Sequence, residues 1–261
     1  LNFDIDNFQA QIFLNTNVQD IKFNWRGTKE NYFSSVILNN LETVGFYPWY
    51  SASNSIIDGQ ISGIFEAHHM PGVDKFYAQF QTDSLYFNNE LFGLLEIDLD
   101  YDDIMKKHKI SGTVHKENEV SMSFDGLYPL DADSDQIDLD LEVFDFNMAH
   151  INQYLPFIEN MSGRGIGFFH FYGPLIQPKF KGDFIIDDLG IYVPFLNSDF
   201  SALGYSSCHL SNEEIEFKEI DFHGVENDVF IGEGLFDGLI THSYFTSFGL
   251  DVNLDIDSLL A

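Results

Sequence analysis

The sequence predicts an all-β protein, and three observations support this prediction. Apolar and polar side chains alternate with a period of two over long stretches, which is the pattern of a strand with one apolar and one solvated face. Turn-forming dipeptides rich in glycine, asparagine and aspartate recur at short intervals. No long segment has the 3.6-residue apolar period of an amphipathic helix. We therefore expect a fold made almost entirely of strands.

Composition and charge narrow the class of protein. The chain of 261 residues carries 12 basic against 42 acidic side chains, a formal net charge of −30. Phosphate groups are bound by clustered lysine and arginine, so this balance argues against a nucleic-acid partner and against adhesion to an anionic membrane surface. The composition also argues against disorder, because the chain is 44% hydrophobic and contains 28 Phe and 12 Tyr. The length suits one large all-β domain or two smaller ones.

Three stretches show the alternation most clearly, at residues 95–101, 136–143 and 250–257. In each of them aliphatic residues occupy one face and mostly carboxylates the other. Like charges on one strand cost stability, but they deter unwanted pairing at sheet edges. The apolar face predicted from these and two further strands consists of Leu95, Ile97, Leu99, Val120, Met122, Phe124, Ile137, Leu139, Leu141, Val143, Phe180, Phe184, Ile186, Leu250, Val252, Leu254 and Ile256.

Turn signals separate the strands, and one short helix interrupts them. A helical turn is predicted at 147–155, where Pro156 stops it, and it is too short to be more than a link. Gly182 and Gly234 stand inside alternating stretches and predict bulges or bends. Turns are predicted at Asp58-Gly59, Pro71-Gly72, Asn88-Asn89, Asp125-Gly126, Lys181-Gly182, 188–190 and Asp237-Gly238.

An internal repeat organises the chain. Residues 59–65 (GQISGIF) resemble residues 163–169 (GRGIGFF), an offset of 163 − 59 = 104 positions. The tetrapeptide FDGL at 124–127 recurs at 236–239. Two similar β units of about 100 residues in tandem indicate an elongated, repetitive sheet rather than a closed globule. We therefore divide the chain into a first β unit at residues 1–150 and a second at residues 151–261.

The one sharp motif places carboxylates at positions 1, 3, 5 and 12 of a calcium-loop template. These carboxylates belong to Asp131, Asp133, Asp135 and Glu142. Two departures weaken the match, because position 6 is Gln136 rather than glycine and the flanks alternate as strands rather than as helices. We interpret the segment as an acidic turn that leads into a strand, and we predict no metal site.

No other constellation points to catalysis or to a cofactor. The adjacent pair His68–His69 lacks the i, i+4 spacing of a helical zinc site, and the other histidines are scattered. Cys208 stands beside His209, but neighbours on a strand point to opposite faces. The single cysteine also excludes an intramolecular disulfide. Because the sequence contains no nucleophile elbow and no phosphate loop, we predict that the chain is not an enzyme and uses no cofactor.

The order of motifs in the second half resembles that of a known family. LPFI at 155–158 leads to MSGRGIG at 161–167 and YGPLIQPKFKG at 172–182, and GIYVPFLNSDF at 190–200 and GLFDGLITHSYF at 234–245 follow. This order resembles the TamB family of translocation and assembly modules, relatives of the AsmA-like proteins of Gram-negative envelopes. The resemblance covers about residues 150–261 and, through the repeat, extends more loosely to the first half.

The resemblance implies a long periplasmic protein anchored in the inner membrane by a helix outside this chain. Consistent with a piece of a longer protein, the first residue, Leu1, already lies in an alternating pattern. The resemblance also implies a sheet curled into a taco with an apolar interior groove. The implied function is outer-membrane biogenesis, with phospholipid acyl chains in the groove and an outer-membrane partner of the Omp85 type bound through another part of the protein.

Independent of the resemblance, the predicted apolar face is compatible with two architectures. A continuous apolar face needs a cover or an apolar ligand, and the sequence supplies no amphipathic helix to cover it. In a folded-over sheet, lipid chains would cover the apolar face. In a β-sandwich, a second sheet would cover it. The leading hypothesis is a non-enzymatic lipid conduit segment. The alternative is an interaction module that docks an outer-membrane assembly partner of the Omp85 type without binding lipid and has a fully packed face. A carbohydrate-binding sandwich is disfavoured, because Trp25 and Trp49 lie away from the acidic turn.

Overall fold

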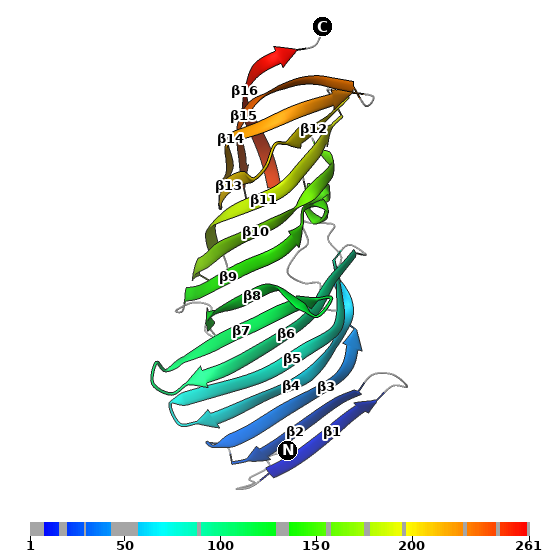
Figure 1. The fold of residues 1–261 in the computed structure, drawn as a ribbon. Helices are drawn as coiled ribbons and strands as arrows, with labels where there is room; N and C mark the ends of the chain where they lie inside the picture. Colours follow the sequence, from blue (N-terminus) through cyan, green and yellow to red (C-terminus); the bar gives the residue numbers. More distant parts are fainter. Residues whose placement is uncertain are drawn as a thin grey trace. The chain divides into compact units, whose positions relative to one another are not determined.

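The computed structural model consists of antiparallel strands and one short helix over the residues that it describes (Figure 1). The described residues are 8–15, 20–28, 30–42, 57–87, 90–128, 136–154, 158–174, 178–194, 197–226, 229–243 and 246–259. The chain divides into two compact units, Leu1–Asp135 and Gln136–Ala261. The prediction of an all-β protein is confirmed.

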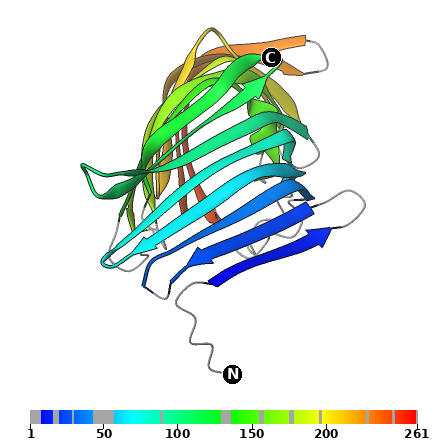
Figure 2. The same ribbon diagram turned by 90° about the horizontal axis from the view of Figure 1, so that it is seen from below.

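The first unit is a meander in which each strand pairs antiparallel with the next one along the chain (Figure 2). The predicted turn at Pro71–Gly72 joins the fourth and fifth strands, and Gly72 adopts a φ of 82° there, which favours glycine. The described strands are β1 (Phe8–Asn15), β2 (Asp20–Gly27), β3 (Tyr32–Glu42), β4 (Ile57–Met70), β5 (Val73–Phe87), β6 (Glu90–Asp102), β7 (Lys107–Lys116) and β8 (Glu119–Tyr128).

Register gives the first unit one apolar face. Residues that pair directly across antiparallel strands point to the same side, so a chain of paired residues forms a row across the sheet. Two such rows are almost wholly apolar. One row is Phe23, Val36, Phe65, Ala78, Leu99 and Ile110, and the other is Leu38, Gly63, Phe80, Ile97, Gly112 and Phe124.

The second unit contains a strand position that is split between two short strands. β11 pairs with β12 near one end and with β13 near the other, and both short strands pair in turn with β14. The elements of this unit are β9 (Gln136–Asn147), η3 (Met148–Tyr154), β10 (Glu159–Pro174), β11 (Lys179–Val193), β12 (Ser198–Ala202), β13 (Ser206–Ser211), β14 (Glu214–Glu226), β15 (Val229–Ser243) and β16 (Thr246–Leu259).

The boundary between the units lies before β9 and not after residue 150. β9 pairs with β10 along most of its length, from Gln136↔Pro174 to Asn147↔Arg164. This ladder ties β9 to the strands that follow it, so the sequence-based boundary placed the strand in the wrong unit. The helical turn predicted at 147–155 is present as η3, a 3-10 helix of seven residues.

The repeat recurs in the hydrogen-bonded register. Gly63 pairs with Phe80 between β4 and β5, and Gly167 pairs with Phe184 between β10 and β11. Both pairs are related by one offset, since 167 − 63 = 184 − 80 = 104. The β4–β5 and β10–β11 hairpins are therefore equivalent elements, and the match of 59–65 to 163–169 is more than a coincidence of glycines.

Several predicted turns lie inside strands, which corrects the interpretation of their glycines. Gly126, Gly182 and Gly238 all belong to strand interiors, as do Asp58–Gly59 and residues 188–190. The physical reason is clearest at Gly182, which pairs with Phe169: a Cβ there would overlap the phenylalanine ring. Gly234 does mark a register shift between β15 and β16, as predicted. The predicted turn at Asn88–Asn89 lies outside the described residues.

Candidate functional site

Most of the predicted apolar residues of the first unit share one face of its sheet. Leu95 pairs with Val114 and through it with Met122, while Ile97 connects through Gly112 to Phe124. Leu99 belongs to the neighbouring row, opposite Ala78. The five predicted side chains on this face are half-buried and partly open to solvent, whereas their partners Ala78 and Val114 are buried.

Val120 lies on the opposite face, which differs from the predicted alternation. It pairs with His115, whereas Met122 pairs with Val114, so the register shifts by one residue between them. The extra residue is Ser121, which is 6% exposed and whose hydroxyl donates a 3.1 Å hydrogen bond to the Val114 carbonyl. A β-bulge of this kind redirects the residue beside it, and Val120 is accordingly 39% exposed.

The predicted residues of β9 and β11 also share one face, and this face is packed more tightly. Leu139, Leu141 and Val143 connect through Phe171, Phe169 and Gly167 to the facing positions on β11. Ile137 pairs with Gly173, and Phe180 with Phe171. Among these residues Val143, Phe184 and Ile186 are 4%, 7% and 1% exposed, respectively.

The four residues predicted on the last strand are placed by their backbone register alone. Their partners on β15 alternate between large apolar residues and glycines. Leu250, Val252, Leu254 and Ile256 pair with Ile240, Gly238, Phe236 and Gly234, respectively. The surroundings of the four β16 side chains lie outside the described part of the structure.

Glycines opposite phenylalanines are the feature that sequence reasoning missed. A Cβ on Gly112 would lie 2.6 Å from a ring carbon of Phe124, and one on Gly167 would lie 2.5 Å from a ring carbon of Phe184. Real side chains do not tolerate such distances, so glycine lets the ring lie flat on the neighbouring strand. The available signal was a glycine that interrupts an alternating strand without ending it.

A cover over the apolar face distinguishes the second unit. η3 contributes Met148, 3% exposed, and the neighbouring strand contributes Met161, 4% exposed. The Met161 N–H donates a 2.7 Å hydrogen bond to the side chain of Asn152 in η3, which fixes the helix to β10. The Phe146 ring contacts His150 of η3 at 5.6 Å and Phe184 at 6.2 Å between ring centroids. This end of the face is closed by the unit's own side chains.

Carboxylates on the polar face are engaged by cations and histidines. Asp140 contacts His170 at 2.7 Å, and Asp102 contacts Lys109 at 2.6 Å. The hydrogen bond from Lys109, with two backbone N–H groups, lowers the pKa of Asp102 to about 2. Of the calcium template, Asp131, Asp133 and Asp135 lie outside the described residues. Within the described ranges no three metal-ligating side chains form a group suited to a metal ion.

Cys208 and His209 point to opposite faces, so the two side chains form no catalytic dyad. Cys208 is 5% exposed on the apolar face opposite Phe184, and burial raises the pKa of its thiol to about 12. His209 lies on the polar face, where it contacts Asp183 at 3.0 Å. The adjacent histidines His68 and His69 lie on β4 in the first unit. His69 has a structural role there, since its ring stacks on Tyr32 with ring centroids 4.7 Å apart.

Comparisons with known proteins identify no family. Among the described residues, no helix combines the length and the apolar character needed to cross a membrane. The chain matches no protein-family model, no curated protein and no solved structure.

Proposed function

We propose that this chain is a non-enzymatic segment of a periplasmic, inner-membrane-anchored protein that shields lipid acyl chains against an apolar sheet face. The single observation that carries the proposal is the half-open apolar face of the first unit. Its rows are continuous across the sheet, yet in this unit only Ala78 and Val114 are fully buried apolar residues among those described. Apolar surface left partly in water costs roughly 25 cal/mol per Å², so an apolar ligand gains free energy by covering it.

The dimensions of the face fit an acyl chain. The row from Leu38 to Phe124 crosses six strands, β3 to β8. With strands about 4.8 Å apart, five steps between strands give a row about 24 Å long. One leaflet of a bilayer holds acyl chains about 15 Å long, half of a hydrocarbon core of about 30 Å. A chain of that length fits along the row, and a sheet curled over it supplies the groove that the TamB-like motifs imply.

A second candidate function is an interaction module, and the packing of the second unit favours it there. Its apolar face is covered by η3 and by its own side chains, which leaves less apolar surface for lipid. Under this alternative the chain docks a protein of outer-membrane assembly and binds no lipid.

Lipid binding by the whole chain, with two matched variants, tests the proposal. Ile97→Arg places a cation on the apolar face, and Gln81→Arg places the same charge on the opposite face, next to Glu96. We expect the wild type to retain phospholipid through purification and to bind a fluorescent fatty acid. We expect Ile97→Arg to weaken that binding at least tenfold while remaining folded, and Gln81→Arg to bind as the wild type does. A wild type that binds no lipid, or equal binding by both variants, contradicts the proposal.

A further inference from the structure

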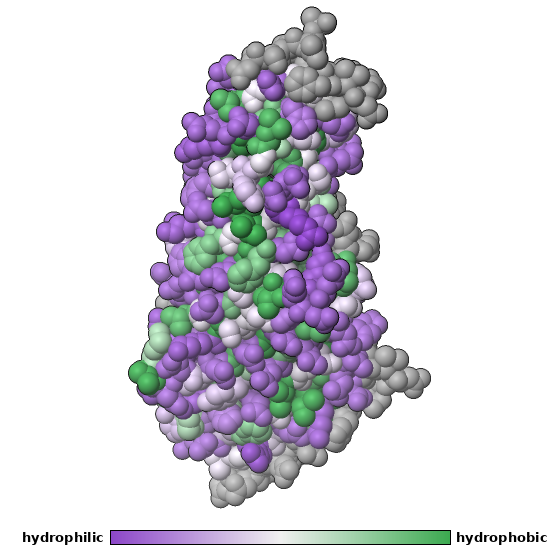
Figure 3. All heavy atoms as spheres, viewed as in Figure 1, coloured by the Kyte–Doolittle hydropathy of each residue, from purple (hydrophilic) through white to green (hydrophobic). Residues whose placement is uncertain are grey.

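The second unit carries an apolar patch on its polar face, which is the face opposite the packed apolar face of that unit. Four large side chains on β9, β10 and β11 point outward, where the rest of these strands presents carboxylates and other polar groups. Figure 3 shows hydrophobic residues gathered over these strands with hydrophilic residues on either side. The outer apolar patch consists of Phe144, Ile166, Phe168 and Ile185, which are 48%, 49%, 44% and 43% exposed, respectively.

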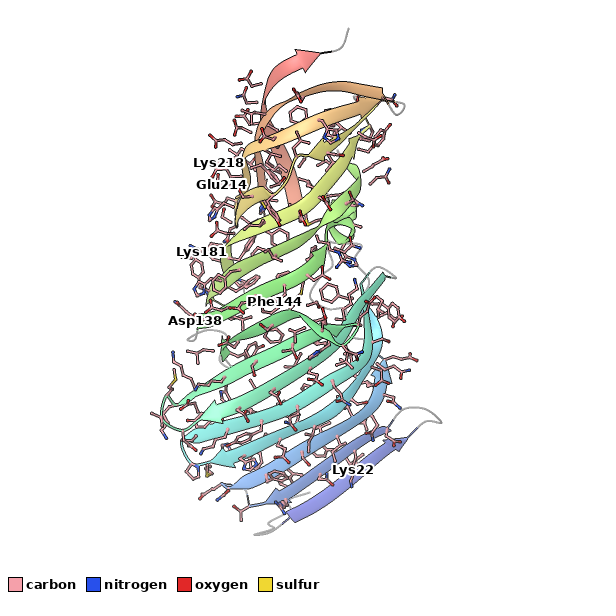
Figure 4. All side chains as sticks on the ribbon, in the orientation of Figure 1. Lys22, Asp138, Phe144, Lys181, Glu214 and Lys218 are labelled. Atoms are coloured by element: carbon pink, nitrogen blue, oxygen red, sulfur yellow. The ribbon has the colours of Figure 1, made fainter. Side chains whose placement is uncertain are left out.

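Strand register joins these residues into one surface. Ile166 pairs directly with Ile185 between β10 and β11. On β9, the pairs Gly165↔Phe146 and Gly167↔Val143 leave two residues, Phe144 and Asp145, opposite Ile166. This bulge presents Phe144 on the same face as Ile166, and Figure 4 labels it on β9. Phe168 follows two residues after Ile166 on β10, so it extends the patch along that strand.

Carboxylates flank the patch on both sides. Phe168 lies between Glu142 and Asp183, which pair with it from β9 and β11. At the other end Asp187 pairs with Arg164, and Arg164 forms a 2.7 Å ion pair with Asp145. Four carboxylates and one guanidinium therefore surround the patch, and the sum −4 + 1 gives a local charge of −3.

We infer that the outer apolar patch docks a cationic amphipathic helix of a partner protein. A second copy of this chain is disfavoured as the occupant, because each copy carries a net charge of −30 and repels the other. Asp183 and Asp187 are four steps apart on β11, which places them about 13 Å from each other along the strand. A helix is about 10–12 Å wide, so one that crosses the strands places its apolar face on the patch and basic residues over both carboxylate ends.

Binding of a model peptide to the whole chain tests this inference. The probe is an 18-residue helical peptide of leucine and lysine, with leucine on one face, followed by fluorescence anisotropy at low salt. Phe144→Ser/Ile166→Thr removes the centre of the patch and should weaken binding at least tenfold. The control Leu203→Ser/Tyr205→Ser removes two side chains that are 53% and 77% exposed elsewhere in the same unit, and it should change binding less than twofold.

A second pair of variants separates docking from bulk attraction between opposite charges. Glu142→Gln/Asp187→Asn removes two charges at the patch, and Glu219→Gln/Asp221→Asn removes two exposed charges on β14. We expect the first pair to weaken binding about fivefold more than the second. Equal weakening by both pairs, or unchanged binding by Phe144→Ser/Ile166→Thr with an unaltered thermal melt, overturns the inference. Ile97→Arg should bind the peptide normally, so this result and the lipid result stand or fail separately.

Discussion

The two units place the same motif in two different surroundings. In the first, Gly63, Phe80 and Ile97 pair across β4, β5 and β6. In the second, Gly167, Phe184 and Cys208 pair across β10, β11 and β13. Phe80 and Ile97 are half-buried, whereas Phe184 and Cys208 are 7% and 5% exposed.

The difference teaches that a strand pattern determines the apolar face but not its cover. Both triads arise from the same alternation and the same glycine–phenylalanine pairing. In the second unit η3 follows β9 directly and packs with Met148 and Met161 on the face. The first unit leaves its rows half-open over the described residues. Apolar surface therefore remains accessible on the first unit, whereas the apolar face of the second unit is mostly covered by its own side chains.

The largest contrast is expected from a buried charge. Phe184→Arg places an ion in a packed face, and we expect it to cost about 4 kcal/mol or more and to unfold the second unit. Phe80→Arg, at the equivalent position of the first unit, should cost only about 1–2 kcal/mol, because a long arginine reaches water from a half-open face. Urea unfolding followed by far-UV circular dichroism measures the free energy of unfolding of both variants. Equal losses would remove the distinction between the units.

An intermediate effect is expected where a glycine accommodates a ring. A Cβ on Gly165 would overlap the edge of the Phe184 ring, and Phe184 is 7% exposed and has little room to move. Gly165→Ala should therefore cost about 2–3 kcal/mol, as overpacking of a core does. The double variant Gly165→Ala/Phe184→Leu should recover part of this loss in a double-mutant cycle.

The matched substitution in the first unit is Gly112→Ala, where the Cβ would meet the half-buried Phe124 ring, which can turn toward the open side, and the Glu96 carbonyl oxygen at 2.5 Å, which cannot. The share of the cost that belongs to the ring is the part recovered by Gly112→Ala/Phe124→Leu, and we expect this recovery to be about 1 kcal/mol or less. A recovery at Gly112 larger than that at Gly165 would contradict the proposed difference in packing.

The smallest expected effect is on the pH dependence of stability, which should differ between the two units. Burial lowers the pKa of His242 in the second unit below its ordinary 6.5. Its neutral form is favoured by folding, so its contribution to stability is complete above pH 6.5 and falls as the pH drops below that value. The urea midpoint of the second unit should decrease slightly between pH 7.5 and pH 5.5, and His242→Gln should remove that part of the decrease.

In the first unit the corresponding change occurs at lower pH. The pKa of Asp102 is lowered from 3.8 to about 2, chiefly by its hydrogen bond from Lys109. The stabilisation is present above pH 3.8 and is lost as the pH falls toward 2. Lys109→Met should flatten the stability profile in this range and leave it unchanged between pH 7.5 and pH 5.5.

Local sequence was sufficient to predict the strands and most of the apolar face. Alternation from Gln136 to Val143 predicted β9, and Pro71–Gly72 predicted the turn between β4 and β5. The errors arose where the deciding partner lies on another strand. Gly126 and Gly182 were wrongly predicted to form turns. The pairing that keeps them inside strands cannot be inferred from their neighbours in the sequence. Val120 was misplaced because the bulge at Ser121 depends on the register with β7.

The cover of the second unit and the outer apolar patch were equally hidden from the sequence. η3 was predicted as a link, but its packing on β10 depends on Asn152 and Met161, which lie in different elements. Phe144, Ile166 and Ile185 are far apart along the chain and meet only through register and the bulge on β9. No pattern within one strand brings them together.

The reactivity of a thiol at the two equivalent positions tests the central difference most directly. Cys208 in the wild type and Ile97→Cys in a Cys208→Ser background occupy matched places beside Phe184 and Phe80. With a maleimide reagent in the native protein, Ile97→Cys should react within about tenfold of its rate in urea. Cys208, buried and with its thiol pKa raised to about 12, should react at least about a hundredfold more slowly than in urea. Equal protection of the two thiols would mean that the first unit has no open apolar face.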